Sequence, residues 1–229
     1  MSSDEISSLA TIRSFIRRQG RITAAQQYAL DFYSSRYCLD PGHAYDFSEV
    51  FGRQAPLAVE IGFGNGDNLA KIAAANPDKD YIGIEVHRPG VGRLMLELDR
   101  QGLSNVKIYC HDALEILEQR IPDNSLHALY LFFPDPWPKK KHHKRRIVRP
   151  DFIDLLARKL VSGGIFHAAT DWRNYAEVML NLLSANKHLI NMSKTNSYCQ
   201  KPDYRALTKF EQRGLRLGHE VWDLIFSKK

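Results

Sequence analysis

Short apolar runs alternate with amphipathic helical patterns along the middle of the chain. Most of the runs lack polar alternation, as strands buried on both faces do. Between them, apolar residues recur at i, i+3, i+4 spacing, as in Leu69/Ile72/Ala73. The five runs are Leu57–Ile61, Tyr81–Val86, Val106–Tyr109, Leu126–Phe133 and Ile165–Ala169, and two further strands with a hairpin-like return are predicted at His188–Met192 and Val221–Phe226.

This order of elements predicts an α/β fold. We expect a doubly wound, seven-stranded, mostly parallel sheet with helices on both faces. In such sheets, ligands bind beyond the C-terminal ends of the strands, where the strand order reverses. Residues that follow directly after each predicted strand are therefore the first candidates for function.

A long insertion separates the fourth predicted strand from the fifth. It contains Pro134-Asp-Pro-Trp137 and a basic run, before Pro150 opens a predicted helix. Residues 139–149 include seven cations and no acid, so the rest of the chain has a formal net charge of −1 and the basic character is local. Such a cluster attracts a polyanion in a salt-dependent manner, although a solvated loop is the alternative.

Composition bounds the class of protein. The 229 residues are 44% hydrophobic and 25% charged, which is ordinary for a globular chain that buries its own core. No run is long enough for a membrane helix and the start is not that of a secretory signal, so we expect a cytoplasmic protein. Three widely spaced cysteines (Cys38, Cys110 and Cys199) offer neither a disulfide framework nor a metal knuckle. Residues 1–45, with several arginines and no clear strand, are expected to form a basic, partly helical arm, and residues 46–229 the main domain.

A glycine-rich loop follows the first predicted strand. Glu60 is followed by glycines at alternate positions, Gly62, Gly64 and Gly66, which exceed what a plain strand-to-helix turn needs. The spacing departs from the nicotinamide fingerprint, and a carboxylate beside the loop disfavours a diphosphate. Glu60 would complement an ammonium or sulfonium group; a core carboxylate in a salt bridge is the alternative reading.

Two further acids follow the second and third predicted strands. Glu85 stands where an acidic side chain accepts the hydroxyls of a ribose, although it could also be a helix-start acid before Pro89. Asp112 could accept a hydrogen bond from an adenine amino group or could cap the next helix. Their combination with the glycine loop makes the ligand-binding interpretation the stronger one.

These residues resemble the S-adenosylmethionine-dependent methyltransferases of the Rossmann-like class. The insertion narrows the resemblance. Its Phe-Pro-Asp-Pro-Trp-Pro-Lys-Lys block, together with later motifs, closely resembles the bacterial tRNA (guanine-N7)-methyltransferase family over nearly the whole chain. The motifs are Phe133–Lys140, Thr170-Asp-Trp172 and Thr208-Lys-Phe-Glu211.

The resemblance implies an activity and a set of roles. S-Adenosylmethionine would donate a methyl group to N7 of a guanosine in the tRNA variable loop, leaving S-adenosylhomocysteine. Asp135 would lie at the catalytic centre and also contact the donor. We expect no metal, no membrane association and no obligatory protein partner. The protein would be a monomer or a homodimer. The donor-binding residues would be Glu60, Gly62, Gly64, Gly66, Glu85, Asp112 and Asp135; the substrate-binding residues Lys139, Asp171, Thr208, Lys209, Phe210 and Glu211; and the RNA-contacting residues Lys140, Lys141, Lys144, Arg145 and Arg146.

Structural alternatives remain for single residues and for the whole chain. Asp135 could belong to a rigid turn with Trp137 as a hydrophobic plug, and Asp171 could be a helix N-cap. A non-catalytic RNA-binding protein, or a methyltransferase for another RNA or a small molecule, would share parts of the pattern. The full acid set disfavours the first of these, and the basic insertion disfavours a small-molecule acceptor.

Overall fold

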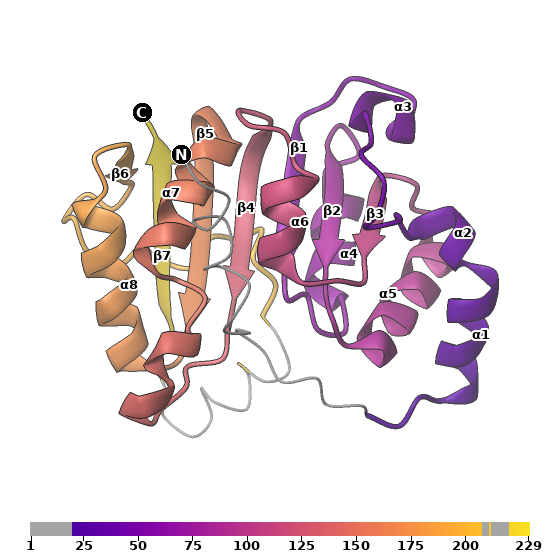
Figure 1. The fold of residues 1–229 in the computed structure, drawn as a ribbon, viewed down its shortest axis with the longest axis horizontal. Helices are drawn as coiled ribbons and strands as arrows, with labels where there is room; N and C mark the ends of the chain where they lie inside the picture. Colours follow the sequence, from indigo (N-terminus) through magenta and orange to yellow (C-terminus); the bar gives the residue numbers. More distant parts are fainter. Residues whose placement is uncertain (1–19, 208–210, 212–219) are drawn as a thin grey trace, which may run out of the picture.

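The centre of the molecule is a seven-stranded sheet with the order β3-β2-β1-β4-β5-β7-β6 (Figure 1). The computed structural model describes residues 20–207, 211 and 220–229. Strands β1 to β5 pair in parallel, whereas β7 runs antiparallel to both of its neighbours. The predicted sheet and its final return are confirmed. The strands are β1 (Leu57–Ile61), β2 (Asp80–Ile84), β3 (Val106–Tyr109), β4 (Leu126–Phe132), β5 (Leu160–Thr170), β6 (Leu189–Asn191) and β7 (Trp222–Lys228).

Helices cover both faces of this sheet, as the alternating pattern predicts. One apolar cluster joins the sheet to α3, α6, α7 and α8, and a second joins it to α1, α4 and α5. In β1, Val59 enters the first cluster and Ala58 the second, because successive side chains of a strand point to opposite faces. The helices are α1 (Ala24–Phe32), α2 (Ser34–Tyr37), α3 (Phe47–Phe51), α4 (Asp67–Ala75), α5 (Arg88–Gln101), α6 (Ala113–Gln119), α7 (Pro150–Lys159) and α8 (Arg173–Ala185).

The strand order reverses between β1 and β4. From β1 the chain goes outward through β2 and β3, then returns to place β4 on the other side of β1. Ile61 at the end of β1 is paired in register with Leu131 near the end of β4. The glycine loop after β1 and the Pro-Asp-Pro turn after β4 therefore leave the sheet side by side, at the position where ligands bind in open α/β sheets.

Part of the segment expected to form an N-terminal arm packs on the domain. Helix α1 lies against α5, and Ala29 and Tyr37 are buried in the second cluster. Cys38 forms an isolated bridge with Ile108, which extends the β3 edge. Among the described residues, the expected boundary at residue 46 therefore does not coincide with a break in packing. Within residues 20–207, 211 and 220–229, no helix combines the length and apolar character needed to span a bilayer.

Candidate functional site

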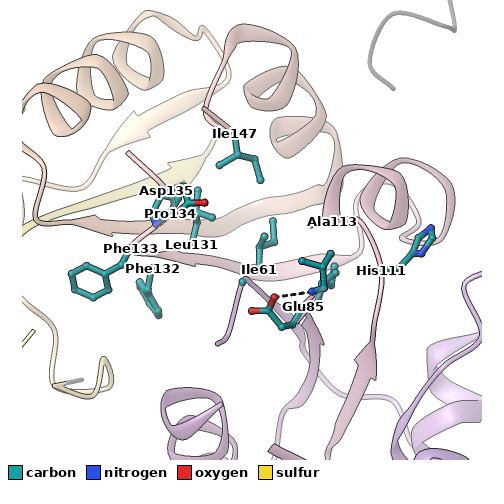
Figure 2. Close-up of a pocket in the computed structure, with 13 residues that line it drawn as sticks. Ile61, Glu85, His111, Ala113, Leu131, Phe132, Phe133, Pro134, Asp135 and Ile147 are labelled. Atoms are coloured by element: carbon teal, nitrogen blue, oxygen red, sulfur yellow. Dashed lines mark hydrogen bonds between the residues drawn. The ribbon is translucent and has the colours of Figure 1, made fainter. Parts of the chain in front are cut away.

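Two adjoining pockets open at the C-terminal edge of the sheet, and Asp135 lines both. The smaller one, of about 220 Å³, lies above β1, β2 and β3; its walls include Glu85, His111 and Ala113. Figure 2 shows Asp135 and Phe133 on the β4 side of this pocket, with Glu85 and His111 on the opposite side. The larger one, of about 1050 Å³, is bounded by Glu60, the glycine loop, Asp171 and residues 205–207.

The glycine loop shapes the wall shared by these pockets. Its three glycines all have positive φ angles (Gly62 68°, Gly64 59°, Gly66 78°), a region that residues with a Cβ seldom adopt. The Glu85 carboxylate accepts the Gly64 N–H at 2.9 Å, and it also accepts the N–H groups of Val86 and His87. The acid after β2 thus braces the loop after β1 while its side chain lines the smaller pocket.

Glu60 is a buried carboxylate at the base of the larger pocket. It is only 3% exposed, and its Oε2 accepts a hydrogen bond of 3.1 Å from Asn68 Nδ2. Burial raises the pKa of Glu60 to about 7, with the Asn68 hydrogen bond acting in the opposite direction. No cationic side chain among the described residues forms a salt bridge with it. The structure therefore does not support the alternative in which Glu60 is a core acid in a salt bridge. A buried carboxylate without a cationic partner is suited to bind a cationic ligand.

Asp112 fulfils the capping role that its position allows. Its Oδ1 accepts the N–H groups of Leu114 at 2.8 Å and Glu115 at 3.4 Å, so it forms the N-cap of α6. The pocket wall in this stretch is made by its neighbours His111 and Ala113. The Asp112 carboxylate, which was predicted to contact adenine, therefore orients the loop whose residues His111 and Ala113 line the smaller pocket.

The Pro-Asp-Pro turn after β4 is held in an unusual backbone conformation. Phe133 and Trp137, which flank the turn, are non-glycine residues with positive φ angles of 52° and 45°. This is why β4 ends at Phe132, one residue earlier than predicted, although the Phe133 N–H still donates to Ala169 O of β5 at 2.7 Å. Backbone strain of this kind is concentrated at functional sites. It leaves the Asp135 side chain exposed where the two pockets meet.

The basic run forms a 3₁₀ helix, Lys140–Arg145, beside the turn. The guanidinium of Arg145 lies 4.9 Å from the centre of the Trp137 ring, and His142 packs edge-on against the same ring at 5.8 Å. The lysines of this helix are exposed and available to a polyanion; they are Lys140, Lys141 and Lys144.

Arg146 differs from the other predicted RNA-contacting residues, because it is buried. Its Nε donates to Pro136 O at 2.9 Å and its second nitrogen to Asn174 Oδ1 at 3.0 Å, while the guanidinium stacks over Tyr175. With 3% of its surface exposed, it offers little to RNA. Its role in this structure is to tie the Pro-Asp-Pro turn to α8.

Cationic and acidic groups of this edge are not arranged around a metal. Within the described part of the chain, no cluster of three or more histidine, cysteine, aspartate or glutamate side chains could hold an ion. The adjacent His142 and His143 lie in the cationic 3₁₀ helix. The pKa of His142 is lowered, mainly by burial and also by the charges of nearby lysine and arginine side chains.

Comparison with known proteins identifies the group to which this architecture belongs. The sequence profile described as "Putative methyltransferase" matches residues 54–224. A tRNA (guanine-N(7)-)-methyltransferase from Alcanivorax borkumensis is 55% identical over 219 residues, covering 95% of this chain and 92% of that protein. One from Shewanella amazonensis is 53% identical, covering 96% and 93%. The chain belongs to the tRNA (guanine-N7)-methyltransferase family.

Solved structures agree on the fold. The 16S rRNA methyltransferase KamB superposes with a TM-score of 0.58 at 15% identity, covering 82% of this chain and 95% of that one. At that identity the likeness concerns the fold alone. The Rossmann-like methyltransferase architecture predicted for this family member is thus confirmed.

In this tRNA (guanine-N7)-methyltransferase family member, the remaining predicted substrate residues have different surroundings. Asp171 lines the larger pocket, and the N-cap of α8 is Trp172, so Asp171 is not a helix cap. Lys139 is exposed beside the 3₁₀ helix. Residues 208–210 (Thr208, Lys209 and Phe210) lie outside the described residues.

Glu211 is buried and paired with Arg205, which lines the larger pocket. Arg205, 1% exposed, donates to both oxygens of Glu211 (2.8 and 2.7 Å) and to both oxygens of Asp223 on β7 (2.7 and 3.0 Å). His167 Nε2 lies 2.7 Å from Asp223, and Tyr204 Oη lies 2.9 Å from His167 Nδ1. Burial, opposed by the Asp223 hydrogen bond, lowers the pKa of His167, so its neutral ring donates to Asp223 and accepts from Tyr204.

Sequence reasoning missed this buried network. An isolated Arg205 in a polar stretch gives no signal of burial, because its partners are Glu211 and Asp223 of β7. The closest available signal was His167 in an otherwise apolar strand, since a buried polar residue needs a partner.

Proposed function

We propose that this chain transfers a methyl group from S-adenosylmethionine to N7 of a guanosine in tRNA. The activity is that of the family to which it belongs, as the names of relatives at 52–55% identity state. The observation that carries the proposal for this chain is that a donor-type pocket and a larger second pocket meet at Asp135. A transferase needs such a junction, because donor and acceptor must approach one another while water is kept out.

The residues present fit the methyl donor. Glu85 would accept the ribose hydroxyls, and the glycine loop allows close approach of the ligand to the backbone. The buried Glu60 carboxylate would face the positive charge of the donor's amino acid part. When bound, the donor supplies an electrophilic methyl group on a sulfonium centre.

The acceptor chemistry limits what the protein must do. Guanine N7 has an in-plane lone pair and no proton to lose, so its attack on the methyl group needs no general base. Positive charge develops on the guanine ring, and the exposed Asp135 carboxylate stabilises it and orients the base. The strained turn holds this carboxylate in place. The largest contribution to the rate comes from holding N7, the methyl carbon and the sulfur in line.

The larger pocket and the basic loop suit a folded RNA. N7 lies on the major-groove edge, which the deep, narrow groove of an RNA duplex hides from side chains, so the target must be an exposed nucleotide such as one in the variable loop. Asp171 lines the larger pocket, and the base would enter the part of that pocket beside Asp171. The exposed lysines of the 3₁₀ helix and Arg145, stacked on Trp137, would face the phosphates.

Replacement of the junction carboxylate tests this assignment. We expect Asp135→Ala to lose most methyl transfer to an unmodified tRNA transcript, while S-adenosylhomocysteine binding by calorimetry stays within a few-fold of wild type. Asp78→Ala, which removes an exposed carboxylate between α4 and β2, is the matched control and should retain activity. Turnover of Asp135→Ala near the wild-type rate would refute the role of Asp135.

A further inference from the structure

Asn68 forms hydrogen bonds to two segments that line the larger pocket. Its Nδ2 donates to Glu60 Oε2 at 3.1 Å, and its Oδ1 accepts the backbone N–H of Ala206 at 2.9 Å. Glu60 belongs to β1, whereas Ala206 lies in the segment 205–207, which is distant in sequence and forms another wall of the same larger pocket. A single amide side chain, 7% exposed, therefore joins the carboxylate at the base of this pocket to its 205–207 wall.

The chemistry of an amide gives this bridge a direction. Asn68 has one oxygen that accepts and one nitrogen that donates, and both are engaged. If the amide turned over, its NH₂ would face the Ala206 N–H, which is also a donor. Its oxygen would face the Glu60 carboxylate, which is also an acceptor, so neither hydrogen bond could form. An ionised Glu60 therefore fixes the orientation in which Asn68 holds Ala206.

The residue next to Ala206 makes the segment a stiff wall. Arg205 is fixed by four hydrogen bonds to Glu211 and Asp223, and its guanidinium lies within 6 Å of the rings of Phe132 and Phe133. Tyr204 is held by His167 of β5. Displacement at Ala206 is thus transmitted to residues that border Asp135, instead of being absorbed by a loose loop.

We propose that Asn68 is a positioning residue that couples occupancy of the methyl-donor site to tRNA binding. A donor whose cationic part rests on Glu60 keeps that carboxylate ionised. The ionised carboxylate locks the Asn68 amide, and the locked amide holds the 205–207 wall in the form that receives the acceptor. The inference rests on the proposed function, since it takes Glu60 as a donor-binding group and the 205–207 side of the larger pocket as part of the acceptor site.

The experiment measures coupling between ligands, which a purely structural role would not change. The affinity of an unmodified tRNA transcript is determined with and without saturating S-adenosylhomocysteine, and that of S-adenosylhomocysteine with and without tRNA. The two ratios must agree, because coupling is reciprocal. We expect about fivefold or more in the wild type, the factor that one net hydrogen bond contributes.

In Asn68→Ala we expect this factor to approach one, because both hydrogen bonds are lost. Asn76→Ala is the matched control: it removes an amide from the end of the same helix, where Nδ2 donates to Ile72 O, and should keep the wild-type factor. Asn68→Asp keeps the acceptor for Ala206 but loses the donor to Glu60, so it should also lower the factor. A factor of one in the wild type, or an unchanged factor in Asn68→Ala, would overturn the proposal.

A further variant separates failure of this inference from failure of the proposed function. Glu60→Gln should weaken S-adenosylhomocysteine binding if Glu60 is a donor-binding group. Unchanged binding in Glu60→Gln would contradict the donor site itself and with it the basis of the coupling. Weakened binding together with wild-type coupling in Asn68→Ala would leave the donor site standing and refute only the bridge.

Discussion

Glu60 is expected to destabilise the ligand-free protein at neutral and alkaline pH. Burial, partly offset by the Asn68 hydrogen bond, raises the pKa of Glu60 from 4.5 to about 7. Between these values the native chain holds a proton that the unfolded chain has released, so the free energy of unfolding falls as pH rises. At about 1.4 kcal/mol per pKa unit, the loss between pH 4.5 and pH 7 is about 3 kcal/mol, and it persists above pH 7.

Glu60→Gln removes this titration while keeping the size of the side chain and an oxygen for Asn68. We expect the variant to be more stable than the wild type at about pH 8, by about 2–3 kcal/mol beyond any difference at about pH 5. Urea denaturation of both proteins without ligand, at several pH values across this range, measures the difference. Glu118→Gln, which changes a half-exposed glutamate on α6, is the control and should show no such trend.

Adding ligand should narrow the stability difference between Glu60→Gln and the wild type. A ligand that binds the native state stabilises it according to its concentration relative to Kd, and a neutral amide complements a cationic amino acid part less well than a carboxylate does. We expect S-adenosylhomocysteine to stabilise the wild type more than Glu60→Gln at about pH 8. A stability difference that stays constant with pH would refute the reasoning from burial, and equal stabilisation by ligand would refute the assignment to the donor site.

Other parts of the site give further predictions. Glu85→Ala should weaken S-adenosylhomocysteine binding tenfold or more by calorimetry, since a charged hydrogen-bonding group is lost. The control Glu118→Ala should keep the wild-type affinity. Equal affinities of Glu85→Ala and Glu118→Ala would contradict the ribose role of Glu85. Arg205→Met should lower the free energy of unfolding by about 3–5 kcal/mol in urea, because two buried carboxylates lose their partner, whereas the exposed Arg158→Met should cost less than about 1 kcal/mol. A similar cost for both would show that the buried network is not a stabilising element. Alanine replacement of the exposed lysines of the 3₁₀ helix, Lys140, Lys141 and Lys144, should reduce the slope of log K against log salt for tRNA binding by about 2. An unchanged slope would show that the RNA binds elsewhere.

The sheet was predictable because its signals are local. Mostly apolar runs such as Leu57–Ile61 are buried on both faces, and the alternation with helical patterns leaves few topologies. The Pro-Asp-Pro block likewise identified the position of Asp135 and the family. The early end of β4 was less accessible, since the positive φ of Phe133 is imposed by the strained turn that follows it.

The site's supporting contacts were not predictable from the sequence, because they join residues far apart in the chain. Arg146 belongs to a basic run, yet its burial depends on Pro136 and on Asn174 of α8. Glu211 carries a family motif, but its carboxylate is directed to a buried Arg205. The sequence leaves two roles open for Asp112, and only the described geometry shows that its carboxylate caps α6.

The most direct test of the central claim is transfer of a labelled methyl group. The full chain is incubated with S-adenosylmethionine carrying a labelled methyl group and with an unmodified tRNA transcript, and the RNA is then digested to nucleosides and separated. The account predicts label in 7-methylguanosine, and much less of it when Asp135→Ala replaces the wild type. Label in a different nucleoside, or no transfer by a wild-type protein that binds S-adenosylhomocysteine, would contradict it.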